Sequence, residues 1–198
     1  MIPTTTRAAL IATLAAGALL TAACSSTDTM GSMASDAPAT VMVGGAAMNS
    51  NRTIVENVVN SRDHTTLVAA VTAAGLVETL SGPGPFTVFA PTNAAFAKLP
   101  AGTVETLVQP ANRATLTKIL TAHVVSGRVS AADLTAAIRA GGGRAVLTTV
   151  SGDTLVATME GGGVVLTDEM GGKARVTQAD VFQSNGVVHV TDTVSLPN

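Results

Sequence analysis

Aromatic and charged side chains are scarce in this sequence. Among its 198 residues there are four Phe and no Tyr or Trp. Charged residues make up 12%, about half the usual share, and the formal net charge is −2. A nucleic-acid-binding protein needs a basic surface for phosphates and usually aromatic rings that stack on bases. We therefore expect no nucleic-acid partner.

Cysteine is also nearly absent, and Cys24 is the only one in the sequence. A single cysteine excludes an internal disulfide, a cysteine-rich zinc site and a CxxC redox pair. What the sequence does hold is 46% apolar residues. A chain of this length and apolar content is expected to fold as one domain with a buried core.

The N-terminal segment has the layout of a secretory signal. Arg7 provides one positive charge, and 8–20 is an uncharged, mostly apolar stretch, too short to cross a bilayer comfortably. Small residues and then Cys24 follow, and Leu20–Cys24 resembles a bacterial lipobox. The resemblance implies cleavage before Cys24, a lipid on its sulfur, and a chain anchored to a membrane of the cell envelope, facing the periplasm or the exterior. Residues 1–23 are then a signal peptide of the lipoprotein type.

Residues 24–40 are predicted to be a flexible tether. Ser25–Thr40 contains four Ser, three Thr, two Asp and no Lys or Arg, and its apolar residues show no periodicity. The folded domain is expected to cover 41–198, with 41–48 as its first ordered piece.

Helix signals gather in the first half of this domain. The apolar spacing predicts helices from Thr53, over 65–74 and from near Ala111. Ser130 with Asp133 resembles a capping box that opens another helix, through Ile138. Short helical turns are expected after Asn93 and around Val104 and Leu107.

Strand signals dominate the second half. Beyond a short strand at 86–89, the expected strands are 146–150, 155–159, 164–167, 175–182 and 187–194, with a tight hairpin turn at Asn185-Gly186. Because helices precede residue 140 and strands follow it, the predicted fold class is α+β.

Motifs for catalysis or metal binding are weak. His64, His123 and His189 lie far apart, without HxH or HxxxH spacing, so no metal site and no cofactor are predicted. There is no GxSxG elbow and no phosphate loop. We expect no enzyme and no catalytic residue, with a hydrolase built on Ser and His as the least favoured alternative.

Three segments, in the same order and spacing, resemble the signatures of fasciclin-like domains. They are Gly84–Phe96, Leu116–Val125 and the stretch from Asn185 through Pro197. The resemblance covers 41–198 and implies helices packed against a wedge of two β-sheets. It also implies a secreted or surface-anchored adhesion protein without a shared catalytic activity.

The resemblance also nominates a partner-binding segment. Members thought to bind receptors carry Tyr before a His in the central segment, whereas Ala122 precedes His123 here. His123, Val124 and Val125 are the candidate partner-binding residues. We expect a monomer, anchored to the membrane through lipid on Cys24, that binds a macromolecular partner at the cell envelope. The alternative is a periplasmic protein that binds a small apolar ligand.

Overall fold

Helices form the first half of the structure and strands most of the second half. The computed structural model describes residues 39–197, so the predicted signal, Cys24 and nearly all of the predicted tether lie outside the described residues. The helices are α1 (Ile54–Val58), α2 (Thr65–Ala74), α3 (Val77–Ser81), α4 (Asn93–Phe96), α5 (Thr103–Leu107), α6 (Arg113–Thr121) and α7 (Ala131–Ala140), with 3-10 turns η1 (Arg62–His64) and η2 (Pro110–Asn112). The strands are β1 (Thr40–Val43), β2 (Ala46–Asn49), β3 (Phe86–Pro91), β4 (Val124–Ser126), β5 (Arg144–Thr148), β6 (Thr154–Glu160), β7 (Gly163–Thr167), β8 (Lys173–Gln183) and β9 (Gly186–Thr191).

Local sequence signals explain where several helices begin and end. The Ser130 hydroxyl accepts from the Asp133 N–H, and the Asp133 carboxylate accepts from the Ser130 N–H, which is the predicted capping box at the start of α7. Thr53 and Glu56 form the same arrangement at the start of α1. Helix α2 covers 65–74 as predicted and ends at Gly75.

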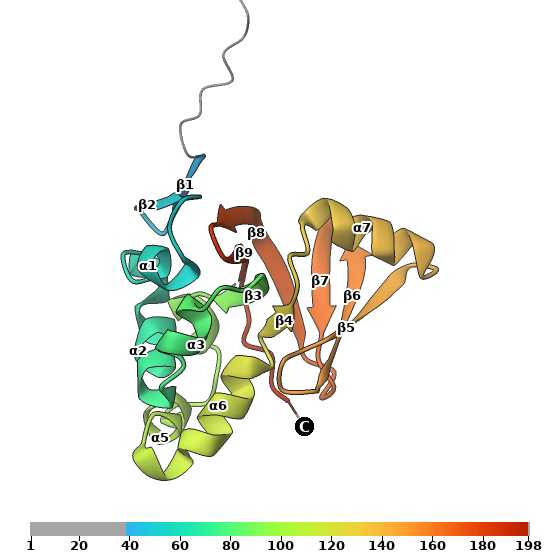
Figure 1. Ribbon diagram of the computed structural model, residues 1–198. Coiled ribbons are helices and arrows are strands. Elements are labelled where there is room, and N and C mark those ends of the chain that lie inside the picture. The colour runs from blue at the N-terminus through green and yellow to red at the C-terminus, as the bar shows by residue number, and fades with distance from the viewer. Residues whose placement is uncertain (1–38, 198) are drawn as a thin grey trace, which may run out of the picture. The chain divides into compact units, whose positions relative to one another are not determined.

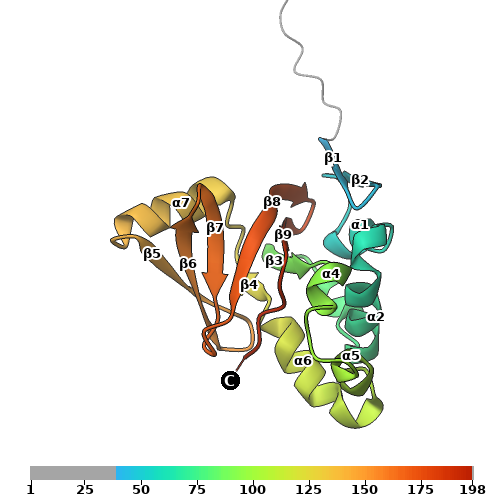
Figure 2. The same cartoon turned by 180° about the vertical axis from the view of Figure 1, so that it is seen from behind.

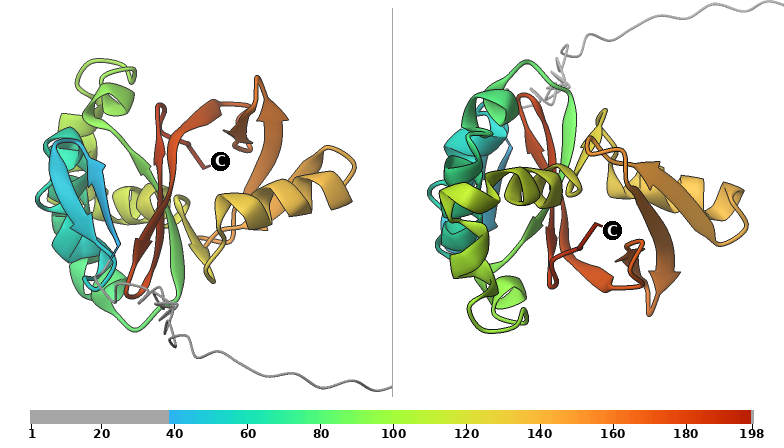
Figure 3. Two further views of the ribbon diagram at one scale, coloured as in Figure 1. Left: turned by 90° about the horizontal axis from the view of Figure 1, so that it is seen from above. Right: turned by 90° about the horizontal axis from the view of Figure 1, so that it is seen from below.

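The strands form a seven-stranded sheet and a separate hairpin. The order in the large sheet is β4-β3-β9-β8-β7-β6-β5, with β3 and β9 parallel and the other neighbours antiparallel. The long strand β8 pairs with β7 at its start and with β9 over the rest, and its pairing with β9 is interrupted by two register shifts. Such bulges bend a strand, so the sheet divides at β8 into two parts that form a wedge (Figure 3). The predicted α+β wedge is confirmed.

Two hydrophobic cores lie on opposite faces of the central strands. Helices α1 to α6 cover one face, and β5–β7 with α7 lie on the other side (Figures 1 and 2). Val88 and Ala90 of β3 belong to the helical core, whereas the intervening Phe89 belongs to the core under α7. Because β9 is also buried along its whole length, its sequence is apolar without alternation except at His189 and Thr191.

The structure differs from the sequence predictions at several places. Two predicted strands have other bounds, since β5 ends at Thr148 rather than at residue 150 and β9 ends at Thr191 rather than at residue 194. Residues 124–126 form β4, paired with β3, and no strand was predicted there. Helix α3 was not predicted, and 40–49 form the hairpin β1–β2. The turn between β8 and β9 consists of Ser184 and Asn185, because Gly186 already pairs with Gln183. A Cβ on Gly186 would lie 2.1 Å from the Phe86 carbonyl oxygen, so close strand approach explains this glycine better than the predicted turn does.

Candidate functional site

The predicted partner-binding segment lies inside the protein. His123, Val124 and Val125 are only 3%, 6% and 6% exposed. The His123 Nδ1–H donates to the Ile119 carbonyl at 2.8 Å, and the Ser195 N–H donates to Nε2 at 2.9 Å. The ring is therefore a neutral imidazole that links helix α6 to the C-terminal segment. Its side chain is not available at the surface for a macromolecular partner.

Burial keeps this imidazole neutral. Desolvation lowers the pKa of His123 below its ordinary value, although the hydrogen bond to Ile119 and the nearby Asp168 charge oppose that shift. Asp168 itself holds the same C-terminal segment, because its carboxylate accepts the Leu196 N–H at 2.8 Å. The backbone N–H groups of Ser195 and Leu196 are thus held by the His123 imidazole and the Asp168 carboxylate, respectively.

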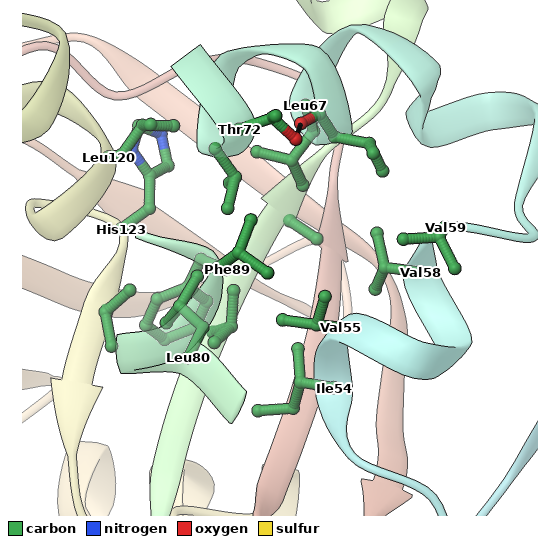
Figure 4. A pocket seen from close by; sticks show the side chains of 16 residues that line it. Ile54, Val55, Val58, Val59, Leu67, Thr72, Leu80, Phe89, Leu120 and His123 are labelled. Atoms are coloured by element: carbon green, nitrogen blue, oxygen red, sulfur yellow. Dashed lines mark hydrogen bonds between the residues drawn. The ribbon is translucent and has the colours of Figure 1, made fainter. Parts of the chain in front are cut away.

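An apolar cavity of about 150 Å³ lies beside this segment. It is enclosed by helices α1, α2 and α3, by strand β3 and by the junction of α6 and β4 (Figure 4). Of the 16 residues that line it, all except Thr72 and His123 are apolar. Two of the three predicted binding residues, His123 and Val124, lie in its wall, whereas Val125 belongs to the core under α7.

His189 has a structural position in the sheet. Its Nε2–H donates to the Val129 carbonyl at 2.9 Å, its Nδ1 accepts from the Asp180 N–H at 3.3 Å, and its ring stacks on Phe89 with centroids 5.6 Å apart. Burial lowers the pKa of His189, so this ring is also neutral. His189 therefore joins β9 to the loop before α7.

One serine–histidine pair is present, but it is buried. The Ser61 Oγ lies 2.8 Å from the His64 Nδ1, and both residues are 1% exposed. Within residues 39–197 no side chain hydrogen-bonds to the other ring nitrogen, so no carboxylate orients the ring. A catalytic triad requires that third group and an accessible hydroxyl. This pair holds η1 against β1 instead, since Ser61 also donates to the Val43 carbonyl.

The described part of the chain offers neither a cluster of metal ligands nor a helix that could span a membrane. There, His, Cys, Asp and Glu side chains nowhere gather in groups of three or more that could hold a metal ion. Every helix in 39–197 is too short or too polar to cross a bilayer. These observations leave the apolar cavity as the candidate site.

Neither the cavity nor the role of Asn185 in holding two of its walls was predicted from the sequence. The spacing of the apolar residues in α1 and α2 predicted helices, but spacing alone does not distinguish a filled core from one that contains a cavity. Asn185 was assigned to a turn, but its side chain accepts from the Ile54 N–H and donates to the Leu80 and Gly82 carbonyls. It thereby ties α1 and α3, two walls of the cavity, to the β8–β9 turn.

Comparisons with known proteins show the family and the fold of this chain. The Fasciclin domain family matches residues 62–197. Protein sll1483 of Synechocystis sp. is 48% identical over 156 residues, which are 79% of this chain and 79% of that protein. The cell surface glycolipoprotein MPB83 of Mycobacterium bovis is 56% identical over 55 residues, 28% of this chain and 24% of that protein. A solved structure, a FAS1 domain pair from the insect cell adhesion molecule fasciclin I, has the same fold, with a TM-score of 0.64 at 19% identity over 72% of this chain and 50% of that one.

Proposed function

Because the chain belongs to the fasciclin domain family, as its three signature segments predicted, we propose that it is an adhesion or interaction protein of the cell envelope. The family match over 62–197 carries this proposal. Two similar proteins are a cell surface glycolipoprotein and a cell adhesion molecule. The domain acts by binding a macromolecular partner, as a monomer and without a catalytic activity.

Lipid on Cys24 holds this domain at the membrane in our proposal. The support is the lipobox-like sequence before Cys24 and the likeness to a glycolipoprotein. A protein with two or more acyl chains stays stably at a membrane, since each buried methylene contributes about 0.8 kcal/mol. The Ser/Thr-rich tether would then give the domain its distance from that membrane.

The partner meets the outer surface rather than the predicted segment itself. The side chains of His123, Val124 and Val125 are buried, so they do not touch the partner directly. In our proposal they hold in place the neighbouring surface residues that do. The exposed continuation of β4 at Ser126 is the nearest part of that surface.

Attachment assays test the adhesion proposal. Cells that lack the protein should adhere less to a surface or to host cells, and the full chain should restore adhesion. Cys24→Ala should fail to restore it and should appear in the medium or the soluble fraction, whereas the matched control Ser25→Ala should behave like the parent. Unchanged adhesion in the deletion strain, with the protein shown on parent cells, would contradict the adhesion role. Retention of Cys24→Ala on membranes would contradict the lipid anchor alone.

A further inference from the structure

We infer that the apolar cavity is a binding site for a hydrocarbon group of about the size of benzene, either a small ring or the end of an alkyl chain. This inference goes beyond the proposed adhesion role and does not depend on it. It gives a physical basis to the small-ligand alternative, which the sequence supported only through its apolar content.

The chemistry of the wall selects an uncharged, apolar ligand. His123 has both ring nitrogens engaged, with Ile119 and Ser195, so it offers the cavity no free donor or acceptor. The Thr72 hydroxyl donates to the Val68 carbonyl at 2.8 Å. A polar ligand would lose its hydrogen bonds to water here without replacing them, and that loss opposes binding.

The size and the apolar lining of the cavity restrict the ligand further. A water molecule in a buried site needs two to four polar partners, and cavities lined by aliphatic and aromatic side chains stay dry. An engineered cavity of about 150 Å³ with such a lining binds benzene or xenon. The cavity here has about the same volume, 150 Å³, and the same kind of lining. A ring of six carbons, or about the same number of chain carbons, therefore fits.

The lining also provides a way in. Its floor is buried and consists mainly of β3 residues such as Val88 and Ala90. Its outer residues are more exposed. Val55 and Val71 are partly buried, and Val59 is 50% exposed. These residues lie on α1 and α2, so the mouth of the cavity lies at these two helices. An alkyl chain could insert its end while a polar head group stays in water at this mouth.

Ligand-induced stabilisation tests the inference. The full chain with Cys24→Ala is used so that no detergent is needed, because a detergent tail would compete for the cavity. Benzene probes binding of a free small hydrocarbon, and octanoate probes binding of an acyl chain end. At about ten times the dissociation constant, either bound probe should raise Tm by about 2–6 °C.

Variants in this chain separate cavity binding from surface binding. Val71→Phe should fill the cavity and abolish the shift in Tm, whereas Val146→Phe, on a strand outside the lining and 64% exposed, should keep it. Val71→Ala enlarges the cavity and should also keep the shift, so a shift lost only in Val71→Phe reflects the filled volume rather than the loss of the Val71 side chain. A shift with benzene alone assigns the site to free small molecules, and a shift with octanoate assigns it to acyl chains. No shift with either probe, or an equal shift in folded Val71→Phe, would overturn the inference.

Discussion

At the scale of single residues, Asn185 connects the β8–β9 turn to α1 and to α3 and the residue after it, and no sequence motif predicted this role. It is 6% exposed and makes three hydrogen bonds to backbone groups of residues 54, 80 and 82. Removing it leaves those groups without partners in the interior, and each unsatisfied buried group costs about 1–3 kcal/mol. We expect Asn185→Ala to lower the free energy of unfolding by about 2–4 kcal/mol in urea denaturation.

The matched control is Asn60→Ala. Asn60 is exposed and makes one local hydrogen bond to the Glu56 carbonyl, so its loss should change stability by less than about 0.5 kcal/mol. Equal effects of the two variants would contradict the role of Asn185 in connecting α1 and α3 to the β8–β9 turn.

The three buried histidines predict a loss of stability in acid. Burial lowers the pKa of His64, His123 and His189, so below about pH 6.5 the unfolded chain binds protons that the folded protein does not. Stability is therefore fully present above pH 6.5 and falls as the pH decreases toward the folded pKa values. Each histidine that stays neutral contributes a slope of about 1.4 kcal/mol per pH unit.

Nearby carboxylates moderate this effect without reversing it. The charges of Asp63, Asp168 and Asp180 raise the pKa of the three histidines, against the larger effect of burial. Urea denaturation at pH 7.5, 6.0 and 5.0 should give decreasing midpoints, and His123→Gln should reduce the slope. Midpoints that do not change between pH 7.5 and pH 5.0 would contradict neutral buried rings.

At the scale of elements, the accuracy of the sequence predictions follows the range of the interaction that forms each element. The start of α7 and the end of α2 depend on residues within four positions, namely Ser130, Asp133 and Gly75, and both were predicted correctly. Strand β4 exists because Val124 and Val125 pair with Val88 and Thr87, about 37 positions earlier in the chain. No local pattern contains that pairing, so no strand was predicted there.

The candidate site was likewise predicted where local sequence determines it and missed where packing between distant elements does. His123 and Val124 were selected from a motif, and they do lie in the wall of the cavity. The cavity itself depends on how far α1, α2 and α3 stand from β3, which is a property of packing between elements. One signal was overlooked: Gly44-Gly45 between two apolar runs is typical of a two-residue hairpin turn, and β1 and β2 are joined there.

The capping box of α7 gives a prediction at this scale. Ser130→Ala removes the hydroxyl that accepts from the Asp133 N–H, and the loss of such a cap costs about 0.5–2 kcal/mol. Thr135→Ala in the same helix is the control, because its hydroxyl only donates to the Ala131 carbonyl one turn earlier and Ala favours a helix. Urea denaturation should show a clear loss for Ser130→Ala and little change for Thr135→Ala. The reverse order would contradict the role of the cap.

At the scale of the whole molecule, the two cores share the same central strands. Val188 and Val190 of β9 belong to the helical core, while the His189 ring between them stacks on Phe89 of the core under α7. Both faces of β3 and β9 must therefore be covered for either strand to remain buried. This sharing indicates that the domain unfolds as one unit, although its helices and most of its strands lie on opposite sides.

Leu134→Ala tests whether the two cores are coupled. Leu134 lies on α7, is 1% exposed and belongs to the core under α7, and its truncation should cost about 2–5 kcal/mol. If β3 and β9 couple the cores, this variant lowers the urea midpoint of the whole domain, and hydrogen exchange accelerates by a similar factor in β6 and in the distant helix α2. Exchange that accelerates only in α7 and β5–β7, with α2 unchanged, would show that the wedge opens at β8 and that the two cores unfold separately.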